Sequence, residues 1–194
     1  VDENTLETTQ ALREFVPHVI VTHPQAPQDN LTLIDQVIQS FAPEFIASCA
    51  ISARAEALKN QIFDLLHSFQ TPPANPQRVL YLIWREPWMT VARDTYISRM
   101  LDLIGWQTYP NIQGGFTGAA RYPALQGDEP FLRDVQRVLL SSEPYRFTQA
   151  HLAQVQHWLP WARVQLVDGE MLSWYGSRSV RGLTYLRQLA SSSL

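Results

Sequence analysis

The sequence lacks the residues from which disulfides and metal sites are usually built. Cys49 is the only cysteine in a chain of 194 residues, so neither an intrachain disulfide nor a cluster of metal-binding thiolates can form. None of the five histidines lies three or four positions from another, the spacing that places two ligands on one helix face. We therefore predict no metal site made of protein side chains.

Motifs of the common enzyme classes are also missing. There is no Gly-x-Ser-x-Gly nucleophile elbow, no phosphate-binding P-loop and no His-Glu-x-x-His zinc helix. The glycine-rich residues 111–120 lack the lysine of a P-loop and the spacing of a dinucleotide fingerprint, so we expect a loop there. These absences favour a binding protein over an enzyme, and no catalytic residue is predicted.

Positive charge is scarce. The net charge is −3 and the isoelectric point is near 5.9, which argues against a nucleic-acid partner because phosphate neutralisation needs a basic face. No run of Lys or Arg suggests binding to an anionic membrane surface. No segment approaches the roughly 20 apolar residues that a membrane-spanning helix needs.

What the chain does contain is an alternation of extended and helical patterns after the proline-rich residues 71–77, which we interpret as a linker. Near-continuous apolar strands that alternate with helices predict a parallel sheet covered on both faces, and so an α/β fold. The expected strands are residues 79–84, 106–109, 135–140 and 164–167, and the expected helices are residues 94–104, 128–133, 148–158 and 178–189.

The part before the linker has fewer elements. We expect a helix over residues 5–15, a short buried strand over residues 18–23 and a long helical region over residues 29–69. Asp29 or Asn30 is expected to cap that region, and Pro43 to kink or divide it. One strand and two helices are too little to close a lobe, so we expect residues upstream of Val1 to complete it.

Aromatic and charged residues follow three of the expected strands. The segments VLYLIWREPWM, VLLSSEPYRF and VQLVDGEMLSWYGSR each leave an apolar run and enter a loop rich in Trp, Tyr, Arg and Glu. Ligands bind outside the carboxyl ends of the strands in open parallel sheets, so these loops predict a binding cleft. The candidate ligand-binding residues are Trp84, Arg85, Trp88, Arg121, Tyr122, Glu143, Trp174, Tyr175 and Arg178.

Each candidate also has a purely structural interpretation. Trp84 and its neighbours could be core residues with a buried Arg–Glu pair, and Tyr122 could cover the core from a turn. Glu143 could cap the following helix, and Arg178 could pair with Asp168 or Glu170. His23, at a strand end, could approach the cleft.

The segments LIWREPWMTVARDTYISRMLDLIGW, RYP, LLSSEPYRF and VDGEMLSWYGSR together resemble one family. The chain is similar to the helical-backbone metal-receptor group of ABC-transporter solute-binding proteins, which bind cobalamin, ferric siderophores or haem. The resemblance implies two three-layer αβα lobes joined by a long backbone helix, with the first lobe incomplete in this chain. It divides the chain into a remnant of the N-terminal lobe (residues 1–28), the interlobe helix (29–70) and the C-terminal α/β lobe (76–194).

The resemblance also implies a function and its site. The ligand would be a metal chelate, cobalamin by preference, held between the lobes of a periplasmic or otherwise extracytoplasmic protein without an intrinsic cofactor. Tyr122 with Pro123 and Trp174 with Tyr175 would line the cleft, and Asp128 or Glu129 would dock on the permease of an ABC importer. Membrane contact would be made only through that permease or a lipid anchor.

Two rival functions remain open from the residues alone. One is a carboxylate-dependent hydrolase that uses Asp168, Glu170 or Glu143. The other is a ligand-free scaffold or sensor that keeps the fold.

Overall fold

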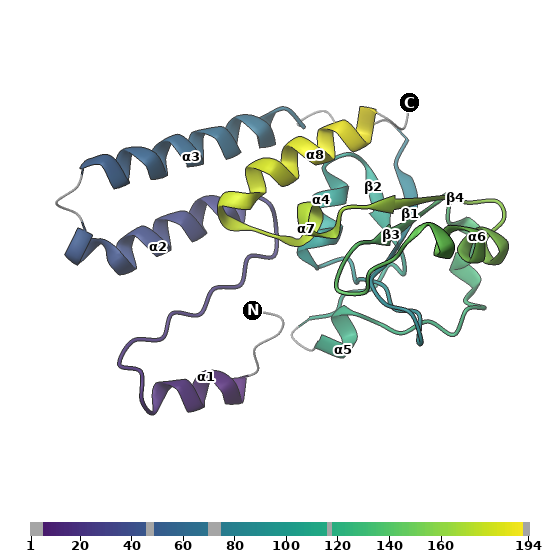
Figure 1. Ribbon diagram of the computed structural model, residues 1–194, viewed down its shortest axis with the longest axis horizontal. Helices are drawn as coiled ribbons and strands as arrows, with labels where there is room; N and C mark the ends of the chain where they lie inside the picture. The colour runs from purple at the N-terminus through teal and green to yellow at the C-terminus, as the bar shows by residue number, and fades with distance from the viewer. Residues whose placement is uncertain (1–5, 46–48, 70–74, 116–117, 192–194) are drawn as a thin grey trace.

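Four parallel strands lie at the centre of the molecule in the order β2-β1-β3-β4 (Figure 1). The strands are β1 (Gln77–Leu82), β2 (Trp106–Thr108), β3 (Arg137–Ser141) and β4 (Arg163–Val167). The computed structural model describes residues 6–45, 49–69, 75–115 and 118–191. The predicted α/β class with a parallel sheet is confirmed.

The continuous apolar run of β1 is explained by burial on both faces. Val79 and Tyr81 point into one hydrophobic core and Leu80 and Leu82 into a second core on the opposite face. All four side chains are fully buried. Because successive side chains of a strand face opposite ways, a strand covered on both sides has no position left for a polar residue.

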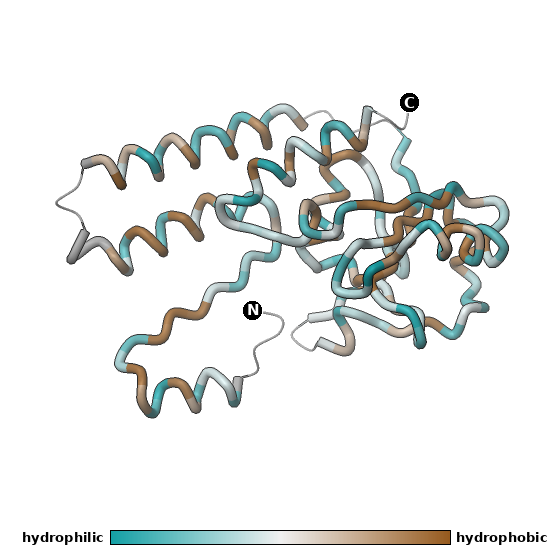
Figure 2. The backbone as a smooth tube through the Cα atoms, in the orientation of Figure 1, coloured by the Kyte–Doolittle hydropathy of each residue, from teal (hydrophilic) through white to brown (hydrophobic). Residues whose placement is uncertain are grey.

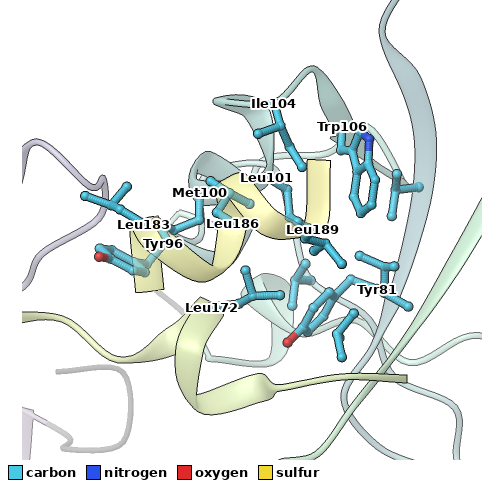
Figure 3. Close-up of a cluster of buried hydrophobic side chains, with 14 of the residues drawn as sticks. Tyr81, Tyr96, Met100, Leu101, Ile104, Trp106, Leu172, Leu183, Leu186 and Leu189 are labelled. Atoms are coloured by element: carbon cyan, nitrogen blue, oxygen red, sulfur yellow. The ribbon is translucent and has the colours of Figure 1, made fainter. Parts of the chain in front are cut away.

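One face of the sheet is covered by helices from both ends of the chain. These are α4 (Tyr96–Asp102), α7 (Gly169–Ser173), α8 (Ser179–Ser191) and the middle of α3 (Cys49–His67). Figure 3 shows Met100 and Leu101 of α4 meeting Leu183 and Leu186 of α8 in this core. The Thr95 hydroxyl begins α4 by accepting the N–H of Ser98.

The opposite face is covered by α6 (Gln149–Trp158) and the short 3₁₀-helix η1 (Pro130–Asp134). The second core therefore lies between β1, β3 and these two elements, and the lobe has three layers. The remaining short helices are α5 (Gly118–Arg121) and the 3₁₀-helix η2 (Gly176–Arg178). Helix α7 was not predicted, and in place of the α-helix expected over residues 128–133 the chain forms the 3₁₀-helix η1, which begins at Pro130.

The predicted long helical region is two helices rather than one rod. Helix α2 (Asp29–Phe45) and α3 lie side by side and run in opposite directions (Figure 1). Ile34 of α2 and Ile62 of α3 are both buried against the sheet lobe, and Lys59 joins the helices through Asp35 at 2.7 Å. An antiparallel pair lets both apolar stripes reach the same core, which a single straight helix could not do. Pro43 lies in the last turn of α2.

The predicted strand over residues 18–23 is wrong. The segment follows α1 (Leu6–Arg13), has no regular structure, and leaves Ile20 and Val21 more than half exposed. None of the described strands lies beside it to accept its backbone hydrogen bonds. Figure 2 shows this apolar stretch on an extended piece of chain beside α1. The described residues form one sheet, so the two-lobed arrangement and its boundaries stay predictions.

Candidate ligand-binding site

The strand order creates a crevice position at the carboxyl edge of the sheet. The chain leaves β1 to build β2 on one side and later returns to place β3 on the other side. The loops that follow β1 and β3 therefore diverge from adjacent strand ends. This is the topological switch point at which open α/β sheets bind ligands.

The loop after β1 presents Trp84 to solvent. Its side chain is 40% exposed, and its ring meets the edge of Tyr145 from the loop after β3 at 5.6 Å. The loop base is fixed by the Thr90 hydroxyl, which donates to the Tyr81 carbonyl at 2.8 Å. Arg85 pairs with Glu86 at 3.0 Å beside it, but the Glu86 side chain is exposed, so this is not the buried pair of the structural alternative. The exposed indole is thus the main feature of this loop.

A second exposed tryptophan is held from two sides. Trp174, 44% exposed, donates its indole N–H to Glu143 Oε1 at 2.8 Å, and the Arg178 guanidinium lies 4.2 Å from its ring centre. The same Glu143 oxygen accepts the Ser173 hydroxyl at 2.7 Å. The indole is therefore fixed in orientation while much of it stays open to a ligand.

The carboxylates proposed for hydrolysis all have such structural contacts. Asp168 begins α7 by accepting the N–H of Met171, and Glu170 forms an ion pair with Arg178. The alternative in which Arg178 pairs with an acid of this turn is confirmed for Glu170. Glu143 links the loop after β3 to α7 rather than capping α6, whose N-cap residue is Thr148.

A pocket joins the N-terminal segment to the sheet lobe. Tyr122 and Tyr175, two of the candidate ligand-binding residues, line it together with His23. The other lining residues are Pro24, Thr95, Tyr96, Ile97 and Ser173. Sequence reasoning missed Tyr96 and Ser173, although each lies within three residues of a helix end near a strand terminus.

Asn30 connects the start of α2 to this pocket. It is fully buried, accepts the Gly176 N–H at 2.6 Å, and donates to the Tyr96 hydroxyl at 2.9 Å and the Pro27 carbonyl at 2.7 Å. The expected capping role is filled differently, because the Asp29 carboxylate accepts the N–H groups of Gln25 and Ala26 in the preceding turn.

Two predicted site residues point into the protein instead. Trp88 is stacked between Phe147 and Trp158 at 6.1 and 5.5 Å, on the edge of the second core. Arg121 is only 2% exposed and donates to the Gly115 carbonyl. The structure therefore does not bring Trp88 or Arg121 to the surface shared by Trp84 and Trp174.

Arg121 lies 3.9 Å from Asp94, whose carboxylate accepts the N–H groups of Gly114 and Gly115, both at 2.8 Å. Burial raises the pKa of Asp94, but these hydrogen bonds and the Arg121 charge outweigh burial and leave that pKa below its ordinary value. A side chain on Gly114 would collide with Arg121, which explains the glycine there.

The residues expected to dock on a permease lie on the turn before η1. Asp128 is exposed, whereas the Glu129 carboxylate accepts the N–H groups of Gln126 and Gly127 at 2.6 and 3.0 Å. Glu129 thus shapes the turn, and Asp128 is the more open of the two. Their docking role stays a prediction.

Among the described residues, no three or more His, Cys, Asp and Glu side chains gather in a group that could hold a metal ion. Within the same residues, no helix has both the length and the apolar character needed to cross a membrane.

The fold is similar to solved periplasmic binding proteins. The heme-binding protein HutB of Vibrio cholerae matches with a TM-score of 0.67 at 21% identity, over 96% of this chain and 72% of that chain. The vitamin B12-binding protein BtuF of Vibrio cholerae matches at 0.65 and 17% identity, over 97% and 71%. A possible iron-binding protein of Staphylococcus epidermidis matches at 0.67 and 13% identity, over 94% and 69%.

These matches confirm, for the fold, the resemblance drawn from the segments at the strand ends. No family model matches the sequence, and no curated protein matches it either.

Proposed function

We propose that this chain acts as a solute-binding protein that captures a metal chelate for delivery to an ABC importer. The observation that carries the proposal is the pair of exposed tryptophans, Trp84 after β1 and Trp174 after α7, which both contact the loop after β3, Trp84 through Tyr145 and Trp174 through Glu143. The fold supports it, because structural neighbours include proteins described as binding heme, vitamin B12 and possibly iron.

The chemistry of the surface suits a large planar ligand. A flat macrocycle gains most from apolar contact with rigid aromatic rings, and Trp174 is already fixed by Glu143 and Arg178. Arg85 and Arg178 would meet carboxylate, amide or phosphate groups on the ligand rim. The chelate carries its own metal ligands, so no protein side chain need coordinate the metal.

Cobalamin remains the preferred ligand, with haem and ferric siderophores as the other members of the class. Asp128 is the proposed permease contact, with Glu129 holding its turn. Such a role places the protein outside the cytoplasm, where an importer receives its cargo.

The test is a titration of the chain with cyanocobalamin, hemin and a ferric siderophore, followed by quenching of tryptophan fluorescence. Trp84→Ala and Trp174→Ala should each weaken the chelate that binds by more than about tenfold, since each removes a large apolar contact. Trp161→Ala is the matched control, because Trp161 is 55% exposed but precedes β4 at the opposite edge of the sheet.

Circular dichroism of each variant checks that the lobe stays folded. Saturable quenching that survives in Trp84→Ala and Trp174→Ala at unchanged affinity would remove this surface as the binding site. No saturable quenching by any of the three chelates would reject the proposed ligand class.

A further inference from the structure

Tyr145 and His151 form a hydrogen-bonded pair at the rim of the candidate site. Tyr145 lies in the loop after β3, with its ring at 5.6 Å from that of Trp84. Its hydroxyl lies 3.1 Å from Nε2 of His151, which belongs to the first turn of α6. Which of these two groups donates the proton decides what Tyr145 can offer to a ligand.

The backbone settles the direction of this bond. The N–H of Thr148 points at Nδ1 of His151 at 2.9 Å, and a backbone N–H can only donate. Nδ1 must therefore carry a lone pair rather than a proton. The Thr148 hydroxyl, 3.0 Å from the same nitrogen, can also donate to it. A neutral imidazole with a bare Nδ1 carries its proton on Nε2, so Nε2–H donates to the Tyr145 oxygen.

Tyr145 consequently keeps its own phenolic proton. A tyrosine hydroxyl accepts one bond and donates another, and its accepting side is already used by His151. Among the residues that the structure describes, no acceptor is hydrogen-bonded to the Tyr145 hydroxyl. The side chain is only half-buried, so its O–H group can reach a molecule seated on Trp84.

The pair is also held rigidly. The Tyr145 ring contacts Phe147 at 4.7 Å and His151 at 5.6 Å, and the Phe147 and His151 rings meet at 5.5 Å. The Tyr145 N–H donates to the Ile83 carbonyl at the end of β1. A donor fixed in advance binds an acceptor at a lower entropic cost than a rotating one.

We propose that Tyr145 donates a hydrogen bond to an acceptor oxygen on the rim of the bound chelate, a carboxylate or carboxamide, and that His151 is the positioning residue for that donor. This hydrogen bond rests on the proposed function, because it names the ligand groups that the same surface would select. A donor at Tyr145 favours chelates that carry polar groups on the rim over chelates that carry only alkyl groups there.

The first experiment compares two probes that differ only at the rim. Hemin carries two carboxylates, whereas iron(III) etioporphyrin carries only alkyl groups. Tyr145→Phe should weaken hemin binding about tenfold, the loss of one hydrogen bond to a charged acceptor, and change etioporphyrin binding by less than about twofold. The affinity of Tyr145→Phe for cyanocobalamin, whose rim carries amides, should fall about fivefold.

Tyr109→Phe is the matched control. Tyr109 is also half-buried, and its ring packs against Phe131 and the Arg78 guanidinium of β1. Removing its hydroxyl should change none of the three affinities.

His151→Gln separates positioning from helix capping. Glutamine at this position of a capping box can still accept the Thr148 N–H, but it no longer orients Tyr145. It should weaken hemin binding about threefold, leave etioporphyrin binding unchanged, and keep the thermal midpoint close to that of the unaltered chain.

The ¹⁵N chemical shifts of the imidazole rings test the hydrogen-bond direction without any ligand. The signals of the His151 ring are identified by their loss in His151→Gln. In the free, unaltered protein their shifts should be those of a bare Nδ1 and a protonated Nε2. A proton on Nδ1 would overturn the inference, as would a Tyr145→Phe variant that binds hemin and etioporphyrin like the unaltered chain. If neither hemin nor cyanocobalamin binds the unaltered chain, the proposed function and this inference both fail.

Discussion

Two apolar segments of this chain have similar sequences and opposite environments. Residues 79–82 of β1 are buried on both faces, with two neighbouring strands and helices above and below. Residues 18–23 carry the comparable pattern HVIVTH, yet they have no regular structure and leave Ile20 and Val21 exposed. The difference lies in the surroundings, because a strand is stable only where other backbone groups pair with it.

The same contrast separates two larger regions. In the sheet lobe, residues 75–191, each strand packs against helices on one or both faces. In the N-terminal region, residues 6–45 and 49–69, the lobe is contacted by the segment around His23 and Pro24, by α2 and by one face of α3, whereas α1 is exposed along almost its whole length. Asn30 joins the two regions through its hydrogen bonds to Tyr96 and Gly176. The predictions below test how far each region depends on the other.

The largest effect is expected at the junction. Asn30→Ala should lower the free energy of unfolding by about 3 kcal/mol, because it leaves the half-buried Gly176 N–H and the hydroxyl of the buried Tyr96 without their partner. Urea unfolding measures the change. Asn111→Ala, an exposed asparagine in the loop after β2, is the control and should have little effect. Equal stability of the two variants would mean that the regions are not joined through Asn30.

A matched valine pair compares the two apolar segments directly. Val79→Ala should cost about 2 kcal/mol, since it removes two fully buried methyl groups and leaves a small cavity. Val21→Ala should cost less than about 0.5 kcal/mol, because that side chain is more than half exposed. A comparable loss at both positions, measured by urea unfolding, would contradict the exposed environment of residues 18–23.

The smallest effect is a pH dependence confined to the sheet lobe. The pKa of Asp94 is lower in the folded chain than the ordinary value of about 3.9, so its carboxylate stabilises the fold at neutral pH. That contribution should be lost as the pH falls below about 4 and through the folded pKa, because protonation then favours unfolding. Urea unfolding at a series of pH values follows the loss.

Asp94→Asn should remove this part of the pH dependence. Burial raises the pKa of Asp102, which acts in the opposite direction. The contribution of Asp94 is therefore the difference between the unaltered chain and the variant. Identical acid profiles for the two would exclude a stabilising role for the Asp94 charge.

Most of the sheet lobe could be predicted because burial on both faces leaves a clear pattern. The run VLYLI, the helix expected before Gly105 and the helix expected over residues 148–158 all use local signals, and the structure has a strand or a helix at each of these places. Helix α7 was not predicted because its five residues are too few to show a helical period. The reversal of chain direction between α2 and α3 could not be predicted from the sequence, because one long helix and two antiparallel helices have the same hydrophobic period.

Which side chains of the candidate site are exposed could be predicted only in part. Trp84 follows β1, Trp174 follows the short helix α7, and both are exposed, as expected. Trp88 lies only four residues from Trp84 but turns toward Phe147 and the second core. Arg121 is buried by Asp94, a partner 27 positions away in the sequence. A loop sequence shows that an aromatic or charged residue is present, but not which side of the loop it faces.

The hydrogen bond between Asn30 and Gly176 has a consequence for how the chain folds. It joins residues 146 positions apart, so it closes only after nearly the whole sheet lobe has been synthesised and assembled. Until then Ile34 of α2 and Ile62 of α3 lack the partners that the sheet lobe supplies. The apolar face that this helical pair turns to the lobe therefore stays uncovered in the nascent chain, and uncovered apolar surface is what chaperones bind and where aggregation begins.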